Sequence, residues 1–400
     1  MKEVAPKKDG APGAPTRREE FLPFCRPSVG EEEIEAVSEV LRSGWLTTGA
    51  RVRELEEGIA ARVGCRDAVA VSSCTAAMHL SLMVAGVGEG DEVITSPYTF
   101  AATGEVILYG KARPVFVDVE RATGNLDPAL LEQAITPRTR AVMPVHIAGL
   151  VCRMDEISEI AAHHGLEVIE DAAHALGASY DGRPVGSLSR FTCLSFYATK
   201  NLTTGEGGMV CLTREGDAER IRRLSLHGLS QDAWGRYTDA GSWAYSIEEM
   251  GYKYNLTDLA AAIGLCQLRR FDAIQERRRE IALQYRSLLK GCDALELPDD
   301  VDGHAWHLFL LRVNPDRLTI DRNEFARRMQ EANIGISVHF IPLHLHPLYR
   351  DLLGHREGDF PVAEEVFQRT ISLPFYPGMS CEDVEYVASM VRWLAREFRR

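Results

Sequence analysis

The chain has 400 residues, of which 45% are hydrophobic and 26% are charged, and its formal net charge is −13. This composition supports a large buried core and excludes a globally disordered chain. An acidic chain repels phosphate backbones, so the composition disfavours a nucleic-acid-binding protein. No apolar run approaches the roughly 18 residues of a membrane span, and the nine cysteines are scattered without a C-x-x-C pair. We therefore expect a cytoplasmic protein with reduced thiols that contacts no membrane.

The N-terminal segment changes character near residue 20. Residues 1–20 are rich in Lys, Pro, Gly and Ala and lack periodicity, which predicts a flexible tail. Ser28 followed by Glu31 has the spacing of a capping box, and apolar residues then recur at helical spacing over residues 34–41. The sequence therefore predicts a helix that Gly44 terminates.

Between residues 65 and 213, short apolar runs alternate with helix-like segments. Apolar strands separated by helices are typical of a mostly parallel sheet that is covered on both faces. We therefore predict an α/β fold with a seven-stranded, mostly parallel sheet. Its strands are expected at residues 68–72, 92–95, 114–119, 140–145, 166–170, 192–196 and 208–213.

The pattern changes after residue 213. A helix near 217–227 precedes a long polar and aromatic connection over residues 227–258, which is typical of a functional loop. The remaining segments predict helices at 257–270, 272–290, 321–332 and 382–398, and strands at HLFLLRV (307–313) and ISVHF (336–340). We interpret residues 21–270 as a large α/β domain and residues 271–400 as a smaller C-terminal α+β domain, joined by the long helix.

Two motifs follow predicted strands and carry chemistry. Ser72 to Thr75 leave a strand and open a helix, where free N–H groups can bind a phosphate or where a Ser side chain can simply cap the helix. Asp171 ends a buried strand, with His174 three residues later. An acidic residue at this edge of an α/β sheet can hold a positive charge of a ligand or cap a helix.

Two further motifs lie later in the chain. Lys200 follows the strand at 192–196, where a desolvated lysine can act as a nucleophile, although most lysines lie on the surface. Asn255 precedes an Ala-rich helix and could be an ordinary N-cap.

Together these motifs match the needs of pyridoxal phosphate. A lysine forms an imine with the cofactor, a carboxylate pairs with the protonated ring nitrogen, and an aromatic side chain stacks on the ring. The aromatic segment Tyr98–Phe100 can supply the stacking side chain. We find no zinc motif, P-loop or dinucleotide fingerprint, and His344 and His346 lack a third metal ligand nearby, so no metal site is expected.

Six ordered segments resemble a known family. They are SGWLTTG, VSSCTAAMHL, GDEVITSPYTFAAT, EDAAHALGA, SFYATKNLTTGEGG and GYKYNLTDLAAAIG. The sequence is thereby identified as a member of the DegT/StrS-type sugar-nucleotide aminotransferases, which are fold-type-I pyridoxal phosphate enzymes. The resemblance runs from about residue 21 to the C-terminus. Within the family the sequence looks most similar to the UDP-4-amino-4-deoxy-L-arabinose–oxoglutarate aminotransferase branch, although the segment IPLHLHPLY resembles equally well the enzymes that aminate UDP-4-keto-6-deoxy-HexNAc sugars.

The resemblance implies a role for each matching residue. Lys200 would be the Schiff-base lysine and the base of the proton shift, Asp171 would pair with the pyridine nitrogen, and His174 would flank the ring near its hydroxyl. Phe100 would stack on the ring. The phosphate would be bound by Thr75, Ala76, Ser195 and, from the neighbouring subunit of a homodimer with shared active sites, Asn255. The sugar nucleotide would contact Trp45, Thr47, Thr48, Gly49 and His339.

Two residues depart from the family pattern. Cys74 stands where Gly or Ala is common, and we expect this modestly larger side chain to be tolerated. Phe100 stands where the arabinose branch has Trp, which counts against that branch.

The activity implied by the resemblance is transamination. The amino group of L-glutamate would pass to the 4-keto group of a nucleotide-activated sugar, expected to be UDP-linked, for the biosynthesis of a cell-surface glycan or lipid A sugar. One alternative is the sugar dehydratase branch, in which His replaces the lysine, and Lys200 argues against it. The other is a catalytically silent or regulatory member of the fold, although every expected catalytic residue is present.

Overall fold

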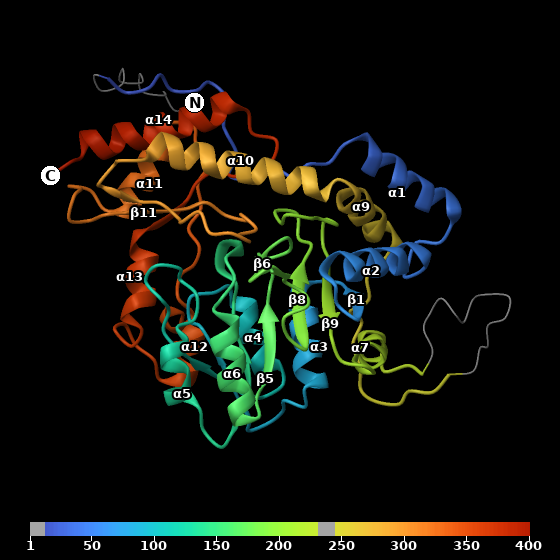
Figure 1. The fold of residues 1–400 in the computed structure, drawn as a ribbon. Helices are drawn as coiled ribbons and strands as arrows, with labels where there is room; N and C mark the ends of the chain where they lie inside the picture. The colour runs from blue at the N-terminus through green and yellow to red at the C-terminus, as the bar shows by residue number, and fades with distance from the viewer. Residues whose placement is uncertain (1–12, 231–244) are drawn as a thin grey trace, which may run out of the picture.

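The computed structural model describes residues 13–230 and 245–400, and its largest element is a seven-stranded sheet (Figure 1). The spatial order is β1-β9-β8-β5-β4-β2-β3. Strand β9 runs antiparallel to both of its neighbours, β1 and β8, and the other six strands of this sheet share one direction. The predicted α/β fold and all seven predicted strands are confirmed: Asp67–Val71 (β1), Glu92–Thr95 (β2), Arg113–Phe116 (β3), Thr139–Met143 (β4), Glu167–Asp171 (β5), Phe191–Ser195 (β8) and Gly208–Leu212 (β9).

Helices cover both faces of this sheet, as the apolar strands require. Successive residues of a strand point to opposite faces, so Ala68 and Ala70 join one core and Val69 and Val71 join the other. The first core is closed by Ala50–Val63 (α2), Met154–His164 (α6) and Asp258–Arg269 (α9). The second is closed by Cys74–Val84 (α3), Ala101–Tyr109 (α4) and Asp217–Ser225 (α7). Leu131–Ala134 (α5) and the hairpin of Ser179–Tyr180 (β6) and Arg183–Pro184 (β7) complete this part.

The N-terminal helix corrects one prediction. Helix α1 spans Glu31–Ser43, and its N-cap is Gly30, whose amide donates to Glu33 Oε2 at 2.8 Å. The predicted capping box at Ser28 is therefore wrong, because the helix is capped two residues later. The Ser28 carbonyl accepts hydrogen bonds from one side chain of α9 and from Arg270, the residue after α9. Gly44 ends the helix as predicted, with a φ of 74° that favours glycine.

The C-terminal part packs around a long helix. Helix α10 (Phe271–Leu289) follows α9 after a break at Arg270, and it lies beside α14 above the small sheet in Figure 1. The small sheet contains Leu295–Glu296 (β10), Leu310–Val313 (β11) and Thr370–Ser372 (β12), all antiparallel. The other helices here are Arg322–Glu331 (α11), Pro347–Leu353 (α12), Pro361–Arg369 (α13) and Cys381–Glu397 (α14).

The segment ISVHF does not form the strand that we predicted. Ser337 makes a single β-bridge, to Ser372, and β12 takes the third place in the small sheet. The chain then leaves the sheet toward Pro342, which has no N–H to continue a ladder. As a result, His339 and Phe340 reach a large cavity instead of extending the sheet.

Several predictions concern the ends and connections of the chain. Residues 1–12 of the predicted tail lie outside the described residues, whereas Arg18 forms an ion pair with Asp383 at 2.6 Å. Residues 231–244 of the predicted functional loop also lie outside them. Leu22 packs with residues of the C-terminal part, and the domain boundary at residue 271 stays a prediction.

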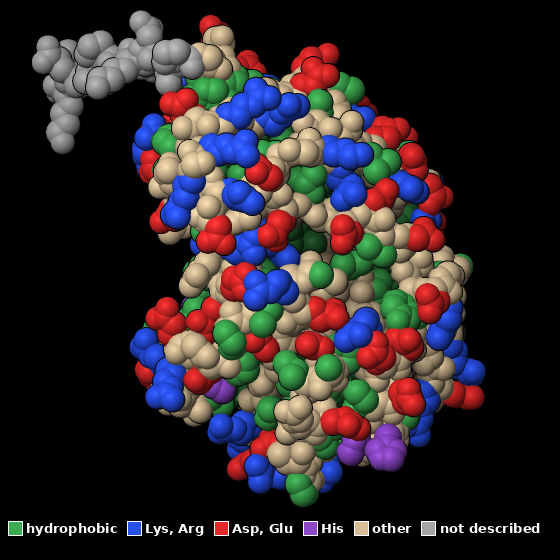
Figure 2. Space-filling model, turned by 60° about the vertical axis from the view of Figure 1, so that its left-hand side comes forward, with side chains coloured by type: hydrophobic (Ala, Val, Ile, Leu, Met, Phe, Trp, Pro, Cys, Tyr) green, Lys and Arg blue, Asp and Glu red, His purple; other side chains and the backbone are tan. Residues whose placement is uncertain are grey.

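The surface and the helices bear on membrane contact and charge. None of the helices in the described parts of the chain is long and apolar enough to cross a membrane. On the face shown in Figure 2, acidic and basic side chains are interspersed. The net charge of −13 is therefore not gathered into one acidic region on that face.

Candidate active site

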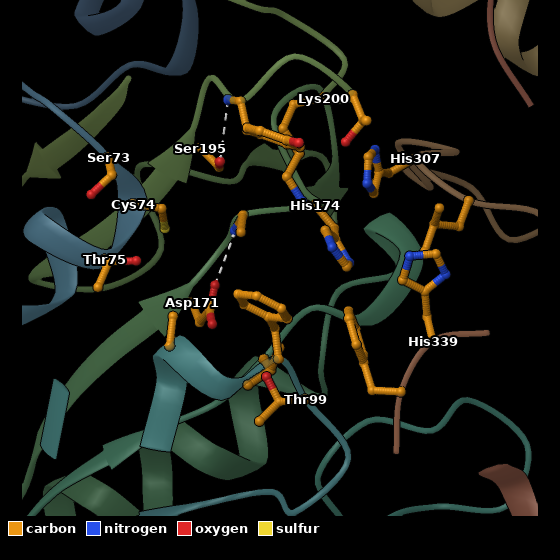
Figure 3. Close-up of a pocket in the computed structure, with 18 of the residues that line it drawn as sticks. Ser73, Cys74, Thr75, Thr99, Asp171, His174, Ser195, Lys200, His307 and His339 are labelled. Carbon is orange, nitrogen blue, oxygen red and sulfur yellow. Dashed lines mark hydrogen bonds between the residues drawn. The ribbon is translucent and has the colours of Figure 1, made fainter. Parts of the chain in front are cut away.

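A cavity of about 530 Å³ lies at the carboxyl ends of the parallel strands. One side of the cavity is formed by the start of α3, the turn before α4 and the segments that follow β5 and β8. The other side is formed by segments of the C-terminal part (Figure 3). Ligands of open α/β sheets bind at this edge. The structure brings seven predicted site residues to the cavity: Thr75, Phe100, Asp171, His174, Ser195, Lys200 and His339.

Asp171 is the buried carboxylate of the cavity. Its Oδ2 accepts from Thr103 Oγ1 at 2.7 Å and its Oδ1 accepts from the Ala173 amide at 3.2 Å. Burial raises the pKa of Asp171, and the hydrogen bond from Thr103 opposes that shift. Thr99 Oγ1 lies 2.7 Å from Thr103 Oγ1 and extends this network to the cavity wall. The carboxylate is therefore held in one orientation at the end of β5.

Lys200 enters the cavity from the turn after β8. Its backbone amide donates to the Tyr197 carbonyl at 2.9 Å, and Tyr197 forms a bridge with Gly205, so the turn is fixed at both ends. Burial lowers the pKa of Lys200 to about 8, although Cys74 and Asp171 oppose that shift. The side chain is therefore an amine that loses its proton close to neutral pH, as nucleophilic lysines do.

The N-terminus of α3 forms another wall. Ser73 is the N-cap, and its Oγ accepts from the Ala76 amide at 3.0 Å. Ala76 itself does not line the cavity, while Ser73, Cys74 and Thr75 do. The earlier amides of a helix have no partner within it and can bind an anion. The Cys74 thiol is buried and donates to the Cys193 carbonyl at 3.3 Å, so this side chain has a partner inside the protein.

Gly208 permits the close approach of β9 to this helix start. A Cβ at Gly208 would lie 2.6 Å from the Cys74 amide nitrogen and would also meet the carbonyl carbon of Ser73. Real Cβ atoms essentially never come this close to backbone atoms. The pattern Gly205-Glu206-Gly207-Gly208 thus returns the chain from Lys200 directly behind the N-terminus of α3.

Three histidines gather on the opposite side of the cavity: His174, His307 and His339 (Figure 3). Burial is the main cause that lowers the pKa of all three, and the charge of Lys200 lowers it further. For His339 the pKa falls to about 4. This side of the cavity is therefore uncharged at neutral pH.

Five further predicted site residues lie outside this cavity: Trp45, Thr47, Thr48, Gly49 and Asn255. Asn255 Nδ2 donates to Thr48 Oγ1 at 2.7 Å, and both line a separate hollow of about 520 Å³. The Trp45 indole nitrogen donates to the Thr48 carbonyl at 3.1 Å, and the Gly49 amide donates to Asp258 at 2.8 Å. Within one chain, these residues and Thr47 do not line the cavity that contains Lys200.

Sequence reasoning missed several residues of the site. Thr103 lies on α4 and donates to Asp171, although it does not itself line the cavity. His307 stands at the start of the segment that contains β11, and Phe340 lies in the segment that we predicted to be a strand. Nothing in the local sequence indicates that these distant segments reach the same cavity.

The chemistry of this cavity fits pyridoxal phosphate. Lys200 is an amine that can reach an aldehyde, Asp171 is a fixed carboxylate for a pyridinium nitrogen, and the start of α3 with Thr75 suits a phosphate. The seven-stranded sheet with one antiparallel strand carries all three. Fold and cavity together define a pyridoxal-phosphate-dependent enzyme of fold type I.

Comparison with known proteins agrees with this class. Spore coat polysaccharide biosynthesis protein SpsC of Bacillus subtilis is 50% identical over 379 residues, which cover 94% of this chain and 97% of that protein. The UDP-4-amino-4-deoxy-L-arabinose–oxoglutarate aminotransferase of Shewanella sediminis is 42% identical over 380 residues, covering 93% and 97% of the two chains. The structure of Spr1654 from Streptococcus pneumoniae in its PLP form is 34% identical, with a TM-score of 0.88 over 94% of this chain and 99% of that chain.

Residues 27–392 match the DegT/DnrJ/EryC1/StrS aminotransferase family. The chain therefore belongs to this family, and it is a pyridoxal-phosphate-dependent sugar aminotransferase.

Proposed function

We propose that this enzyme transfers the amino group of L-glutamate to the 4-keto group of a UDP-linked sugar, for the biosynthesis of a cell-surface polysaccharide. The observation that carries the proposal is the meeting of Lys200 and Asp171 in one cavity, on a fold whose relatives include an oxoglutarate aminotransferase named for a UDP sugar. The name of the Bacillus subtilis relative, a spore coat polysaccharide biosynthesis protein, supports the proposal that the aminated sugar is used to build a polysaccharide.

The residues of the cavity have different proposed roles in the reaction. When bound, pyridoxal phosphate supplies the electron sink that lets an amino group leave one carbon and join another. Lys200 attaches the cofactor and, as a neutral amine, moves the proton at the carbon that loses or gains the amino group. Asp171 holds the positive charge at the ring nitrogen, and Thr103 keeps the carboxylate in place for that task.

Other residues bind and orient. Thr75 and Ser195 are proposed to bind the phosphate, together with the amides at the start of α3. Phe100 lies at the cavity with its ring centroid 6.1 Å from that of Phe340, and it is proposed to cover one face of the cofactor ring. His174 is proposed to flank that ring.

The second cluster supports a homodimer with shared sites. Asn255, Thr48 and Trp45 lie away from the cavity of their own chain. We propose that they complete the cavity of a partner subunit, where Asn255 reaches the phosphate and the segment from Trp45 to Gly49 contacts the sugar nucleotide with His339.

The test separates the two half-reactions. Enzyme loaded with pyridoxal phosphate is mixed with L-glutamate, and the 2-oxoglutarate that forms is measured against the amount of enzyme, with L-aspartate and L-glutamine as control donors. Enzyme that has received the amino group is then offered UDP-, GDP- and dTDP-linked 4-keto sugars. We expect one equivalent of 2-oxoglutarate and amination of a UDP sugar. Failure of glutamate, or preference for another nucleotide, would contradict the respective part of the proposal.

A further inference from the structure

The start of helix α2 is capped by a side chain from another helix. Its N-cap is Gly49, which has no side chain that could accept from the first amides of the helix. Asp258, the first residue of α9, supplies the acceptor instead. Its Oδ1 accepts from the Gly49 and Val52 amides at 2.8 and 3.0 Å, and its Oδ2 accepts from the Arg51 amide at 3.3 Å. One carboxylate thus binds three amides at a helix N-terminus, where negative charge is favoured.

Further hydrogen bonds join the segment before α2 to the segment before α9. The Asp258 amide donates to the Thr47 carbonyl at 3.1 Å. Thr48 Oγ1 donates to the Leu256 carbonyl at 2.5 Å, and it accepts from Asn255 Nδ2 at 2.7 Å. Because a carbonyl can only accept, the Thr48 proton goes to Leu256 and its lone pair orients the Asn255 amide. Backbone and side-chain groups therefore hold the two segments together at several points.

The two segments also pack too closely for a side chain at Gly49. A Cβ there would lie 2.7 Å from Asp258 Oδ2 and 2.4 Å from Trp45 Nε1. The Asp258 residue is only 4% exposed, so its carboxylate is enclosed between the helices that it joins. We call residues 45–49 and 255–258 the paired segments. Their contacts make them one unit, with Asp258 at its centre.

The paired segments carry two roles that the proposed dimer assigns to different residues. Under the proposed function, on which this inference rests, Asn255 reaches the cofactor phosphate in the partner's cavity and residues 45–49 contact the sugar nucleotide there. We propose that Asp258 is a positioning residue that fixes these two contacts relative to each other, so that one unit binds both ligands. Asp258 does not line the cavity that contains Lys200 in its own chain, so it acts through the residues that it holds.

One substitution and a matched control test this role. Asp258→Asn keeps the size of the side chain and removes one acceptor oxygen. Asp118 is the control because it is likewise buried, with 9% exposed, and its carboxylate also accepts from three amides. These are the amides of Val119, Val362 and Ala363, at 2.9, 3.0 and 2.8 Å. The last two lie at the start of α13, which does not line the cavity. We therefore expect Asp258→Asn and Asp118→Asn to lose similar amounts of thermal stability.

Only Asp258→Asn should weaken ligand binding. We expect the Kd of pyridoxal phosphate and KM for the sugar nucleotide each to rise about tenfold, because hydrogen bonds to a carboxylate are lost. With saturating cofactor, kcat and KM for L-glutamate should change far less, since the paired segments are proposed to contact only the phosphate and the sugar nucleotide. Equal effects of the two substitutions, or a loss in kcat alone, would overturn the proposal. A wild type that forms no 2-oxoglutarate from L-glutamate would instead contradict the proposed function.

Mixed dimers show which cavity Asp258 serves. An Asp258→Asn chain and a Lys200→Ala chain, each with its own affinity tag, are isolated as a heterodimer. The one cavity that retains Lys200 then belongs to the Asp258→Asn chain and is completed by the native paired segments of the other chain. We expect KM for the sugar nucleotide to return to the wild-type value. A KM as high as in the Asp258→Asn homodimer would overturn the proposal, because Asp258 would then act on its own chain.

Hydrogen exchange of the wild type tests the same unit without a substitution. Pyridoxal phosphate is proposed to contact Asn255 and not α2. If the paired segments act as one unit, cofactor binding should nevertheless slow amide exchange at residues 49–52, whose amides Asp258 accepts. The amides of Val362 and Ala363 should exchange equally with and without cofactor. Slowed exchange at Asn255 but not at residues 49–52 would overturn the proposal, even if Asp258→Asn failed to fold.

Discussion

Thr103 Oγ1 donates to Asp171 Oδ2 at 2.7 Å, and the adjacent carboxylate of β5, Glu170, receives a matching bond from Thr192 at 2.8 Å. The two threonines are fully buried. Thr103→Val should therefore raise the pKa of Asp171 further and weaken cofactor binding about tenfold, since a hydrogen bond to a charged group contributes about 1.5–3 kcal/mol. Cofactor affinity, measured by fluorescence titration, checks this expectation.

Thr192→Val is the control for that experiment. It also removes a buried hydroxyl that donates to a carboxylate, but Glu170 faces His146 and does not line the cavity. We expect similar losses of thermal stability in the two variants and a loss of cofactor affinity only in Thr103→Val. Equal cofactor affinity in both would show that Thr103 does not support Asp171.

Lys200→Ala should keep the fold and end turnover. The side chain makes no hydrogen bond or ion pair within the described parts of the chain, so its removal costs no such contact. After treatment with pyridoxal phosphate and borohydride, the wild type should gain the mass of one reduced cofactor at residue 200. The control Lys111→Ala, which removes an exposed lysine paired with Glu89, should still gain it. An active Lys200→Ala enzyme with bound cofactor would refute the assignment.

The acidity of Lys200 predicts a pH dependence of cofactor attachment. Burial lowers the pKa of this amine to about 8. Attack on an aldehyde requires the unprotonated amine, whose fraction falls about tenfold for each pH unit below that value. We expect the rate of cofactor attachment to rise with pH and to level off above about 8. Stopped-flow absorbance of apoenzyme mixed with pyridoxal phosphate measures this profile, and a rise that continues toward pH 10.5 would contradict it.

The same shift affects the stability of the cofactor-free enzyme. The unfolded chain keeps the proton of Lys200 up to the ordinary pKa of 10.5, whereas the folded chain releases it near 8. The unfolded state therefore binds more protons between these values, and the free energy of unfolding gains a positive contribution as pH rises through this window. Lys200→Met lacks this contribution. Denaturant titrations of both proteins across the window should show the difference in slope.

The shared-site arrangement predicts recovery of activity in mixed dimers. Asn255→Ala should weaken cofactor binding, because Asn255 is proposed to reach the phosphate in the partner's cavity. Mixing it with Lys200→Ala should create one cavity with both native residues. We therefore expect assays at limiting pyridoxal phosphate to show more activity in refolded mixtures than in either variant. No recovery in verified heterodimers would mean that each site is built from one chain.

The sequence predicts the sheet better than it predicts the cavity. Each strand of the large sheet is a short apolar run between helices, so local pattern and burial agree, and the strand-end residues Asp171 and Lys200 follow from the parallel order. The prediction fails at residues 336–340, where alternation resembles a strand but the chain bends so that His339 and Phe340 reach the cavity. His307 was missed for a related reason. Its position depends on packing between segments far apart in the chain, which no local pattern encodes.

The bare backbone at Gly208 links the architecture of the sheet to the affinity for an anion. Because β9 runs against its neighbours, the strand that leaves the lysine turn begins directly beneath the amides of Cys74. A methyl group at Gly208 would push β9 away from the start of α3 without replacing any polar side chain of the cavity. Affinity for phosphate at the proposed site would therefore depend on the absence of a side chain at Gly208 as well as on the groups that contact the ligand.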